Sequence, residues 1–395
     1  MKIFKRIYYP VMAVLVVLML TLGIVDARVG ASGGKNGDAA YSYATAIANE
    51  THNGYRPAAQ SAVRDMIVST LTEAGATRVE SEATDDDGKN LVDYATVGET
   101  AVPSVYVQKC VVTHEAQGDD ATVSVAREVE NVILSVPGTG ANAILLYARY
   151  DGATVGGAAD ATATGALLAA ATDVLKDAAN GKTYANSVVF LFGDAGQEDD
   201  LGAHAFLHQF AGFGNIAAKV RAVADFRVGG TGGTLMLYGG NDNLNCIGKY
   251  ASFNGGTFAS SALELFMKRS NEDAFGAFGD YNTLHFTNRG GFNRYATASD
   301  TKVNKKLTKQ QYNAMGKFVS GFANATGNLS SKSSAVYFSY LDVMTVYYPA
   351  AVAFVIAGVI LGLVIAIVIL NVRNKAFPWG KALAGAAVQL VTLLA

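Results

Sequence analysis

Two long runs without a charged residue, one near each end of the chain, place the strongest constraint on its fold. The first run covers residues 7–25 and the second covers residues 343–372. About 20 apolar residues cross the hydrocarbon core of a bilayer, which is roughly 30 Å thick, so both runs predict transmembrane helices. Basic residues precede the first run and follow the second, namely Lys2, Lys5, Arg6, Arg373 and Lys375.

The basic residues beside the two runs also predict an orientation. Lys and Arg next to a membrane span stay in the cytoplasm, so we expect an integral membrane protein whose large middle region is extracytoplasmic or lumenal. The first run has an alternative interpretation as a cleaved signal peptide, because Val25 and Ala27 resemble a small-residue cleavage site.

The predicted domains follow from this arrangement. Residues 1–26 are a cytoplasmic stub and anchor, 27–342 an extracytoplasmic domain, 343–372 a second span, and 373–395 a cytoplasmic loop with the start of a third apolar segment. The last apolar run, 382–395, would be about 21 Å long as a helix. That length is too short for a crossing, so we expect the natural protein to continue.

Composition excludes several classes of protein. Charged residues make up 16% of the chain, against about 25% in an average soluble protein, and the deficit lies in the apolar ends. The net charge of −2 and the lack of a dense Lys/Arg stretch with aromatic residues argue against a nucleic-acid partner. Two cysteines are too few for a four-cysteine zinc site or a disulfide framework.

The middle region alternates between helical and strand patterns. Apolar spacing predicts helices, and short apolar runs predict strands buried on both faces. Such alternation favours the α/β class, with a mostly parallel central sheet flanked by helices. The predicted helices are 59–75, 165–176 and 202–210, and the predicted strands are 105–113, 122–129, 131–136, 143–148, 187–192 and 220–226.

Ligands of open α/β sheets bind beyond the carboxyl ends of the strands. In this chain those ends are residues 149–151, 193–200 and 227–233. We therefore expect a functional site, if the domain has one, in these three loops.

The same loops carry a family resemblance. The segments AILLYARYDG, GGAADATATGALLAAATDVL and VVFLFGDAGQEDDLGAHAF resemble zinc-dependent exopeptidases of the aminopeptidase Y and glutamate carboxypeptidase type. Within that family they look most like the membrane-anchored endoplasmic-reticulum and vacuolar metallopeptidases. The resemblance covers about residues 40–372, includes the late segment YATASDT, and implies the zinc-exopeptidase fold.

The resemblance also implies a metal site that can be followed position by position. Enzymes of that family hold two zinc ions with His, Asp and Glu ligands, one carboxylate bridging, and use a further Glu as general base. The bridging aspartate corresponds to Asp160, and the aspartate of the first-strand His-x-Asp motif to Asp151. The other positions are Arg149 for the first histidine, Gly196 for the general base, Gln197 for the paired glutamate, Arg227 for the next acidic ligand and Ala296 for the final histidine.

These replacements remove the ligand chemistry. A guanidinium has donors and no lone pair, so an arginine cannot ligate a metal, and glycine and alanine have no ligating group. A one-residue shift would bring Glu198 and Asp199 to the paired position, but the two arginines and the alanine would remain. The sequence thus predicts a degenerate peptidase in which Asp160 is the only retained ligand, with no catalytic residue and no zinc.

The retained and replaced residues suggest a second expectation. Two carboxylates left without cations would repel each other, and planar guanidinium groups suit carboxylates. We expect Arg149 and Arg227 to form one salt-bridge cluster with Asp151 and Asp160. The alternative is that Arg149 points to solvent.

The predicted function is a membrane-anchored binding or scaffold module, for peptides or partner membrane proteins, that has lost zinc binding and hydrolysis. The alternative is an active zinc-dependent aminopeptidase of the same family, with zinc as cofactor. A third class, a transporter or receptor, stays open because further membrane spans would define it.

Several other motifs have simpler interpretations. His204 and His208 have the spacing of two zinc ligands, but no Glu follows His204 as in zinc peptidases, so we interpret them as a solvated pair. The remaining motifs are residues 198–200 complementing a helix dipole, residues 229–233 as a flexible turn, residues 85–87 as a solvated loop, an allowed Cys110–Cys246 disulfide, and glycosylation acceptors at Asn49, Asn324 and Asn328.

Overall fold

The computed structural model of this chain describes residues 37–79, 83–84, 90–91, 101–117, 122–152, 157–197, 200–209, 216–240, 244–253, 257–270, 276–278, 281–326, 333–340 and 344–373. The chain divides into two compact units, Met1–Tyr347 and Tyr348–Ala395, which are described separately.

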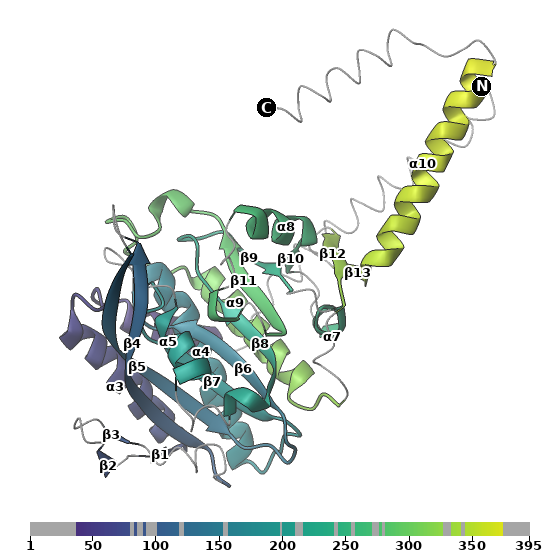
Figure 1. The fold of residues 1–395 in the computed structure, drawn as a ribbon. Coiled ribbons are helices and arrows are strands. Elements are labelled where there is room, and N and C mark those ends of the chain that lie inside the picture. Colours follow the sequence, from purple (N-terminus) through teal and green to yellow (C-terminus); the bar gives the residue numbers. More distant parts are fainter. Residues whose placement is uncertain are drawn as a thin grey trace. The chain divides into compact units, whose positions relative to one another are not determined.

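A nine-stranded sheet forms the centre of the first unit (Figure 1). Its strands, in spatial order, are β1 (Thr77–Val79), β4 (Ser104–Gln117), β5 (Thr122–Val136), β7 (Ser187–Gly193), β6 (Ala143–Arg149), β8 (Val220–Phe226), β11 (Thr283–Arg289), β9 (Thr234–Gly239) and β10 (Phe258–Ala259). Two short sheets join β2 (Ala83–Thr84) to β3 (Asn90–Leu91) and β12 (Ala335–Tyr340) to β13 (Met344–Pro349).

The sheet is mixed, so the prediction of a mostly parallel sheet was wrong. The predicted strands β7, β6 and β8 pair in parallel, and β11, which was not predicted, pairs in parallel with β8. In contrast, β4–β5, β5–β7 and β9–β11 are antiparallel. The reason is local for β4 and β5: four residues join Gln117 to Thr122, and so short a connection can only bring the next strand back antiparallel. The predicted strands 122–129 and 131–136 are one continuous strand, β5.

Helices cover the sheet. They are α2 (Gly37–Ile47), α3 (Pro57–Glu73), α4 (Ala158–Ala179), α5 (Leu201–His204), α7 (Leu244–Phe253), α8 (Ser261–Ser270) and α9 (Lys305–Phe322). A π-helical turn, Ala205–Gln209, continues α5, and single 3₁₀ turns form at Gly276–Phe278 and Phe292–Arg294. The helices predicted over 59–75 and 165–176 are confirmed as α3 and α4, whereas the one over 202–210 is α5 followed by the π-helical turn.

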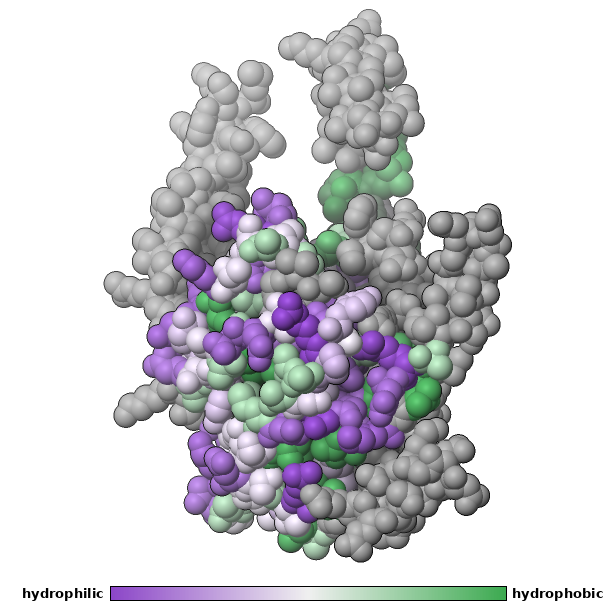
Figure 2. Space-filling model, turned by 90° about the vertical axis from the view of Figure 1, so that its left-hand side faces the viewer, coloured by the Kyte–Doolittle hydropathy of each residue, from purple (hydrophilic) through white to green (hydrophobic). Residues whose placement is uncertain are grey.

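The core lies on both faces of the sheet because neighbouring side chains of a strand point to opposite faces. On β6, Leu146 packs in the larger cluster together with Leu167 of α4, whereas Tyr147 packs in the smaller cluster with Phe206 and Phe278. Apolar burial on both faces explains why β6 and β7 are continuous apolar runs in the sequence. On the face seen in Figure 2, hydrophilic residues are interspersed with small hydrophobic areas over the described residues.

Helix α4 is fixed closely against α2, and this contact positions the site. A Cβ on Gly165 would lie 2.4 Å from the backbone nitrogen of Ala44, so only glycine allows this approach of the two helices. Helix α4 is buried over most of its length, and its first turn carries Asp160.

The second unit contains α10 (Ala350–Arg373). The predicted span 343–372 begins instead with β13, so the helix starts only at Ala350. None of the helices within the described residues qualifies as a membrane-crossing segment. The other predicted span, residues 7–25, and the apolar run 382–395 lie outside the described residues.

Candidate functional site

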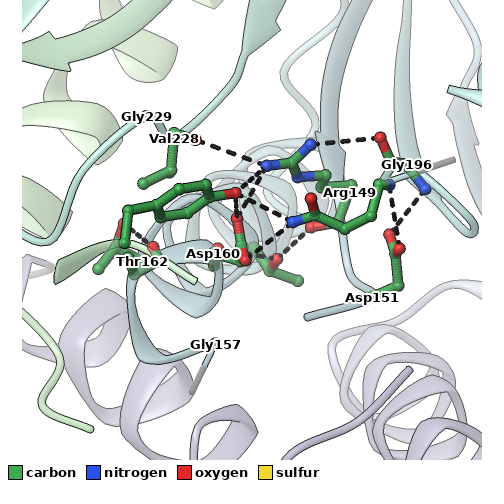
Figure 3. Close-up of polar contacts among 12 residues, drawn as sticks. Arg149, Asp151, Gly157, Asp160, Thr162, Gly196, Val228 and Gly229 are labelled. Carbon is green, nitrogen blue, oxygen red and sulfur yellow. Dashed lines mark hydrogen bonds and ion pairs between the residues drawn. The ribbon is translucent and has the colours of Figure 1, made fainter. Parts of the chain in front are cut away.

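The candidate site lies where the parallel strands β6, β7 and β8 end, as the sequence predicted. Arg149 is the last residue of β6, and Asp151 follows it. The loop after β7 brings Gly196 and Gln197 to the same place, and the first turn of α4 brings Asp160 (Figure 3). Arg227 directly follows β8.

Arg149 and Asp160 form a buried ion pair at the centre of this arrangement. The Nη2 group of Arg149 lies 3.0 Å from Oδ1 of Asp160, and the two side chains are 13% and 1% exposed. The other guanidinium nitrogen, Nη1, donates to the carbonyl of Gly196 at 3.2 Å, and Nη2 also approaches the carbonyl of Val228 at 3.5 Å (Figure 3). Arg149 therefore points into the site, and the alternative of a solvent-directed side chain was wrong.

Two further side chains complete the contacts of Asp160. The hydroxyl of Tyr295 donates to Oδ1 of Asp160 at 2.8 Å and accepts a hydrogen bond from Nη2 of Arg149. The amide of Gln197 donates to Oδ2 of Asp160 at 3.2 Å and to the Tyr295 hydroxyl at 3.0 Å. Both oxygens of this carboxylate therefore accept hydrogen bonds from side chains, namely a guanidinium, a phenol and an amide.

Asp151 serves a different purpose from Asp160. Its two carboxylate oxygens accept hydrogen bonds from the backbone nitrogens of Gly196 and Gln197, at 2.9 and 3.2 Å. These bonds tie the loop after β7 to the end of β6. Burial raises the pKa of Asp151 to about 7, although the charge of Arg149 opposes this shift.

Gly196 leaves room for Arg149. A Cβ at position 196 would lie 2.6 Å from both Cβ and Cδ of Arg149, which is closer than real Cβ contacts. The side chain of Arg149 thus fills the space that a side chain at residue 196 would need. The two replacements predicted from the sequence are sterically coupled.

Arg227 belongs to a neighbouring buried network. Its Nη2 lies 2.6 Å from Oδ2 of Asp200, and its Nε donates to Oδ2 of Asp225 at 2.8 Å. The same oxygen of Asp225 lies 2.8 Å from Nδ1 of His285. Burial would raise the pKa of Asp225, but Arg227 and His285 outweigh it and lower that pKa.

The predicted single salt-bridge cluster was therefore wrong in its membership. Arg149 pairs with Asp160, and Arg227 pairs with Asp200 and Asp225, while Asp151 is bound by backbone groups. Asp200 was expected to complement the dipole of a helix, but its carboxylate makes no capping hydrogen bond and binds Arg227. Both arginines nevertheless neutralise carboxylates at the strand ends, as the sequence suggested.

Three non-glycine residues adopt left-handed backbone conformations beside the site: Ala195, Asp200 and Ala296, with φ of 49°, 55° and 54°. Such conformations are uncommon and tend to cluster at functional sites. Ala296 follows Tyr295, and its exposed methyl group offers no ligand. The conformation fixes the loop that aims Tyr295 at Asp160.

Sequence reasoning missed the polar partners that come from distant segments. Tyr295 is 135 residues from Asp160, and His285 is 60 residues from Asp225. Only the motif YATASDT could have pointed to Tyr295. Asp300 of that motif also reaches the site, because its carboxylate accepts hydrogen bonds from the backbone nitrogens of Gly157 and Ala159 at the start of α4.

The minor motifs are only partly described. No helix follows residues 229–233, which instead lead into β9, and the side-chain amide of Asn288 binds the carbonyls of Gly230 and Gly232. Cys246 is buried in α7. Several predicted features lie outside the described residues, namely Glu198, Asp199, Asn328, residues 85–87 and the side chains of Cys110 and His208.

The described residues do not offer a metal-ligand set. Among them, no group of three or more His, Cys, Asp or Glu side chains could hold a metal ion. Around Asp160 the donors are a guanidinium, a phenol and an amide nitrogen. A zinc ion needs lone pairs from His, Cys or carboxylate ligands, so the described donors do not fit a pair of zinc ions.

The mixed sheet flanked by helices, with acidic residues at its parallel strand ends, defines an α/β protein. The family model described as Peptidase family M28 matches residues 131–323. The match spans β5 to α9 and so includes the whole candidate site.

Three solved structures show distant likenesses to this chain. The aminopeptidase from Aneurinibacillus sp. strain AM-1 is 14% identical to this chain, with a TM-score of 0.40. The alignment covers 53% of this chain and 52% of the aminopeptidase, so this chain spans about half the length of that protein. A glutaminyl cyclase from Porphyromonas gingivalis is 16% identical with a TM-score of 0.45, covering 72% and 96%. The LapA aminopeptidase from Legionella pneumophila is 10% identical with a TM-score of 0.47, covering 74% and 73%. No curated protein matches the chain.

Proposed function

We propose that this chain holds a peptidase family M28 domain that serves as a binding module and has lost zinc binding and hydrolysis. The observation that carries the proposal is the ion pair between Arg149 and Asp160. Asp160 occupies the position that resembles the bridging ligand, and a guanidinium holds one of its two oxygens. A metal ion and this guanidinium would compete for the same carboxylate.

Charge balance supports this interpretation. A buried carboxylate needs a compensating cation or strong hydrogen bonds. Arg149 supplies a fixed positive charge, and Tyr295 and Gln197 supply hydrogen bonds. The site is therefore neutralised without a metal ion.

The position of the general base gives independent support. Hydrolysis by a zinc peptidase needs a base that takes a proton from water. Residue 196 has no side chain, and Arg149 fills the adjoining space. Asp151 cannot readily replace the base, because both of its oxygens accept backbone hydrogen bonds.

The alternative is an active zinc enzyme of the same family. Its support is that two acidic residues, Asp151 and Asp160, are present at the strand ends, and that Glu198 and Asp199 lie beside them in the sequence. In that case a peptide amino terminus would be the substrate, as the names of the two aminopeptidases described above suggest for those proteins.

Metal analysis and turnover decide between these functions. The full chain, purified in neutral detergent without chelators, is analysed for zinc by mass spectrometry. It is then assayed with aminoacyl and glutaminyl peptides, with and without added zinc. Less than one bound zinc per chain and no turnover would support the proposal. Two zinc ions per chain, or turnover that a chelator abolishes and zinc restores, would overturn it.

A matched variant controls for inactive preparations. Replacing Arg149→His and Gly196→Glu together removes the guanidinium and restores two groups with ligand or base chemistry. Zinc bound by this variant, but not by the wild type, would identify residues 149 and 196 together as the positions that exclude the metal.

We also propose that the chain is held at a membrane with the domain on the extracytoplasmic side. Because no described helix qualified as a membrane span, this part rests on the sequence and on α10, where Phe354, Val355 and Leu361 are more than half exposed. Extraction with alkaline carbonate tests it: a chain that stays with the membrane pellet supports the proposal, and a chain released to the supernatant overturns it.

A further inference from the structure

A strongly basic surface borders the candidate site and takes no part in it. Between residues 294 and 309 the chain carries five basic side chains and one acidic side chain, although its overall net charge is −2. The acidic one, Asp300, is 1% exposed and bound by backbone nitrogens. We define the basic rim as Phe292, Arg294, Lys302, Lys305, Lys306 and Lys309.

Hydrogen bonds join the two segments that carry most of the rim. The carbonyl of Gly291, next to Phe292, accepts a hydrogen bond from the backbone of Thr231. The carbonyl of Thr231 in turn accepts from the side chain of Asn304, which caps α9 and precedes Lys305. Through Thr231, the loop that carries Phe292 and Arg294 is therefore joined to the start of α9.

Most of the rim faces solvent. Phe292 is 59% exposed, and Arg294, Lys302 and Lys306 are exposed as well. Lys305 and Lys309 share one carboxylate, that of Asp38, at 3.1 and 3.0 Å. The rim thus keeps a net positive charge together with an exposed aromatic ring.

The position of the lysines is unfavourable for the helix itself. The amino-terminal end of a helix carries partial positive charge, which favours acidic residues in its first turn. The first turn of α9 contains Lys305 and Lys306 and no acidic residue. A charge pattern that opposes local stability needs another reason, and recognition of an anion provides one.

The rim adjoins the site through single residues. Arg294 precedes Tyr295, whose hydroxyl reaches Asp160. Lys302 lies two residues after Asp300, which binds the first turn of α4. A ligand lying across the strand ends would therefore meet the rim next.

We propose that the basic rim binds acidic segments of polypeptides, rich in Asp and Glu, and orients them across the candidate site. A polypeptide fits better than a nucleic acid, because the net charge of −2 gives no wider field for a polyanion. It fits the family match as well, since the family model that matches this region describes peptidases. This inference rests on the proposed function only because it takes a polypeptide as the ligand. The binding of acidic polypeptides to the basic rim is expected whether or not the candidate site is catalytically active.

The test measures binding of a fluorescein-labelled peptide of glutamates by anisotropy, using the full chain in neutral detergent. A peptide with glutamine at every glutamate position is the ligand control. Binding is expected for the acidic peptide alone, and it should weaken between about 0.05 and about 0.5 M NaCl because salt screens exposed charges.

The variant for the rim is Arg294→Glu, Lys302→Glu and Lys306→Glu together. Surface ion pairs contribute up to about fivefold each to binding, so the triple variant should bind the acidic peptide roughly 10-fold to 100-fold more weakly. Lys176→Glu is the matched control, because Lys176 is exposed in the last turn of α4, far along the helix from Asp160. Its affinity should stay within about twofold of the wild type.

The variant should also unfold at a higher denaturant concentration than the wild type, because Lys306→Glu places an acidic residue in the first turn of α9. Weaker binding with unchanged or raised stability supports the proposal and excludes misfolding as the cause. Unchanged affinity of the triple variant, or equal binding of the glutamine peptide, would overturn it. Tighter binding of a single-stranded oligonucleotide or of short-chain phosphatidylglycerol than of the acidic peptide would overturn it too. Zinc content is measured on the same samples, so failure here is distinguishable from failure of the proposed loss of metal.

Discussion

Removal of Arg149 tests the central contact of the site. The variant Arg149→Ala leaves the carboxylate of Asp160, whose side chain is 1% exposed, without its cation. Breaking one partner out of a buried ion pair costs about 3–5 kcal/mol of unfolding free energy. Tyr295 and Gln197 still donate to Asp160, so we expect a loss near the lower end, about 3 kcal/mol.

The reverse variant, Asp160→Ala, leaves a buried guanidinium. Arg149 then keeps the carbonyls of Gly196 and Val228 as acceptors, at 3.2 and 3.5 Å. Neutral carbonyls compensate a cation less well than a carboxylate does, so a loss of about 3–5 kcal/mol is expected here as well. The double variant removes both charges and should be more stable than the sum of the two losses predicts, by about 0.5–3 kcal/mol.

The assay is urea unfolding of the full chain in neutral detergent, followed by circular dichroism. All four proteins of the cycle are compared at the same pH and detergent concentration. Losses under about 1 kcal/mol for each single variant, the range of exposed pairs, together with simple additivity, would refute the reasoning. In that case the ion pair would contribute no more than a surface contact.

Three further predictions follow from other contacts. Gly196→Ala should lower the urea midpoint in the wild type but much less when Arg149→Gly is also present, since the added Cβ lies 2.6 Å from both Cβ and Cδ of Arg149 and only glycine at residue 149 removes both atoms; equal effects in both backgrounds would contradict this. The pKa of Asp151 is raised to about 7 in the folded state, so between about pH 4 and about pH 7 the unfolded state binds fewer protons than the folded state. The free energy of unfolding should therefore fall as the pH rises through this range, and it should fall less in Asp151→Asn. Urea midpoints measured across the same pH range test this expectation. Arg227→Gln leaves the buried carboxylates of Asp200 and Asp225 together and should cost about 3–5 kcal/mol of unfolding free energy. The control Arg221→Gln, at a half-buried guanidinium that donates to the backbone carbonyls of Ala218 and Val220, should cost about 1 kcal/mol in the same unfolding assay.

Features that depend on local sequence were predictable. Continuous apolar runs predicted β6 and β7 within one residue of their ends, because strands buried on both faces are rich in apolar side chains. The strand predicted over 220–226 is β8. The parallel pairing of these strands then placed Arg149, Arg227 and the loop with Gly196 at one edge. The positions of the candidate residues follow from that edge.

Features that depend on long-range contacts were not predictable from local patterns. The periodicity of apolar residues does not predict whether Arg149 and Arg227 bind the same carboxylate or different ones, because this depends on how far each side chain extends across the neighbouring strands. Asp200 illustrates the limit, since its left-handed backbone turns the carboxylate away from α5 and toward Arg227. The antiparallel pairing of β4 with β5 depends on the short connection between Gln117 and Thr122, and the apolar pattern of the two strands contains no information about it.

The steric coupling of residues 149 and 196 makes the present state hard to reverse. With the arginine in place, any single substitution that adds a side chain at position 196 meets atoms of that arginine at 2.6 Å. Losing the arginine first would strand a buried carboxylate. Each single step back toward a metal-binding site therefore passes through a less stable protein. A double change that keeps any Cβ at residue 149 still leaves the 2.6 Å contact with a side chain at residue 196, so the backbone itself would have to move.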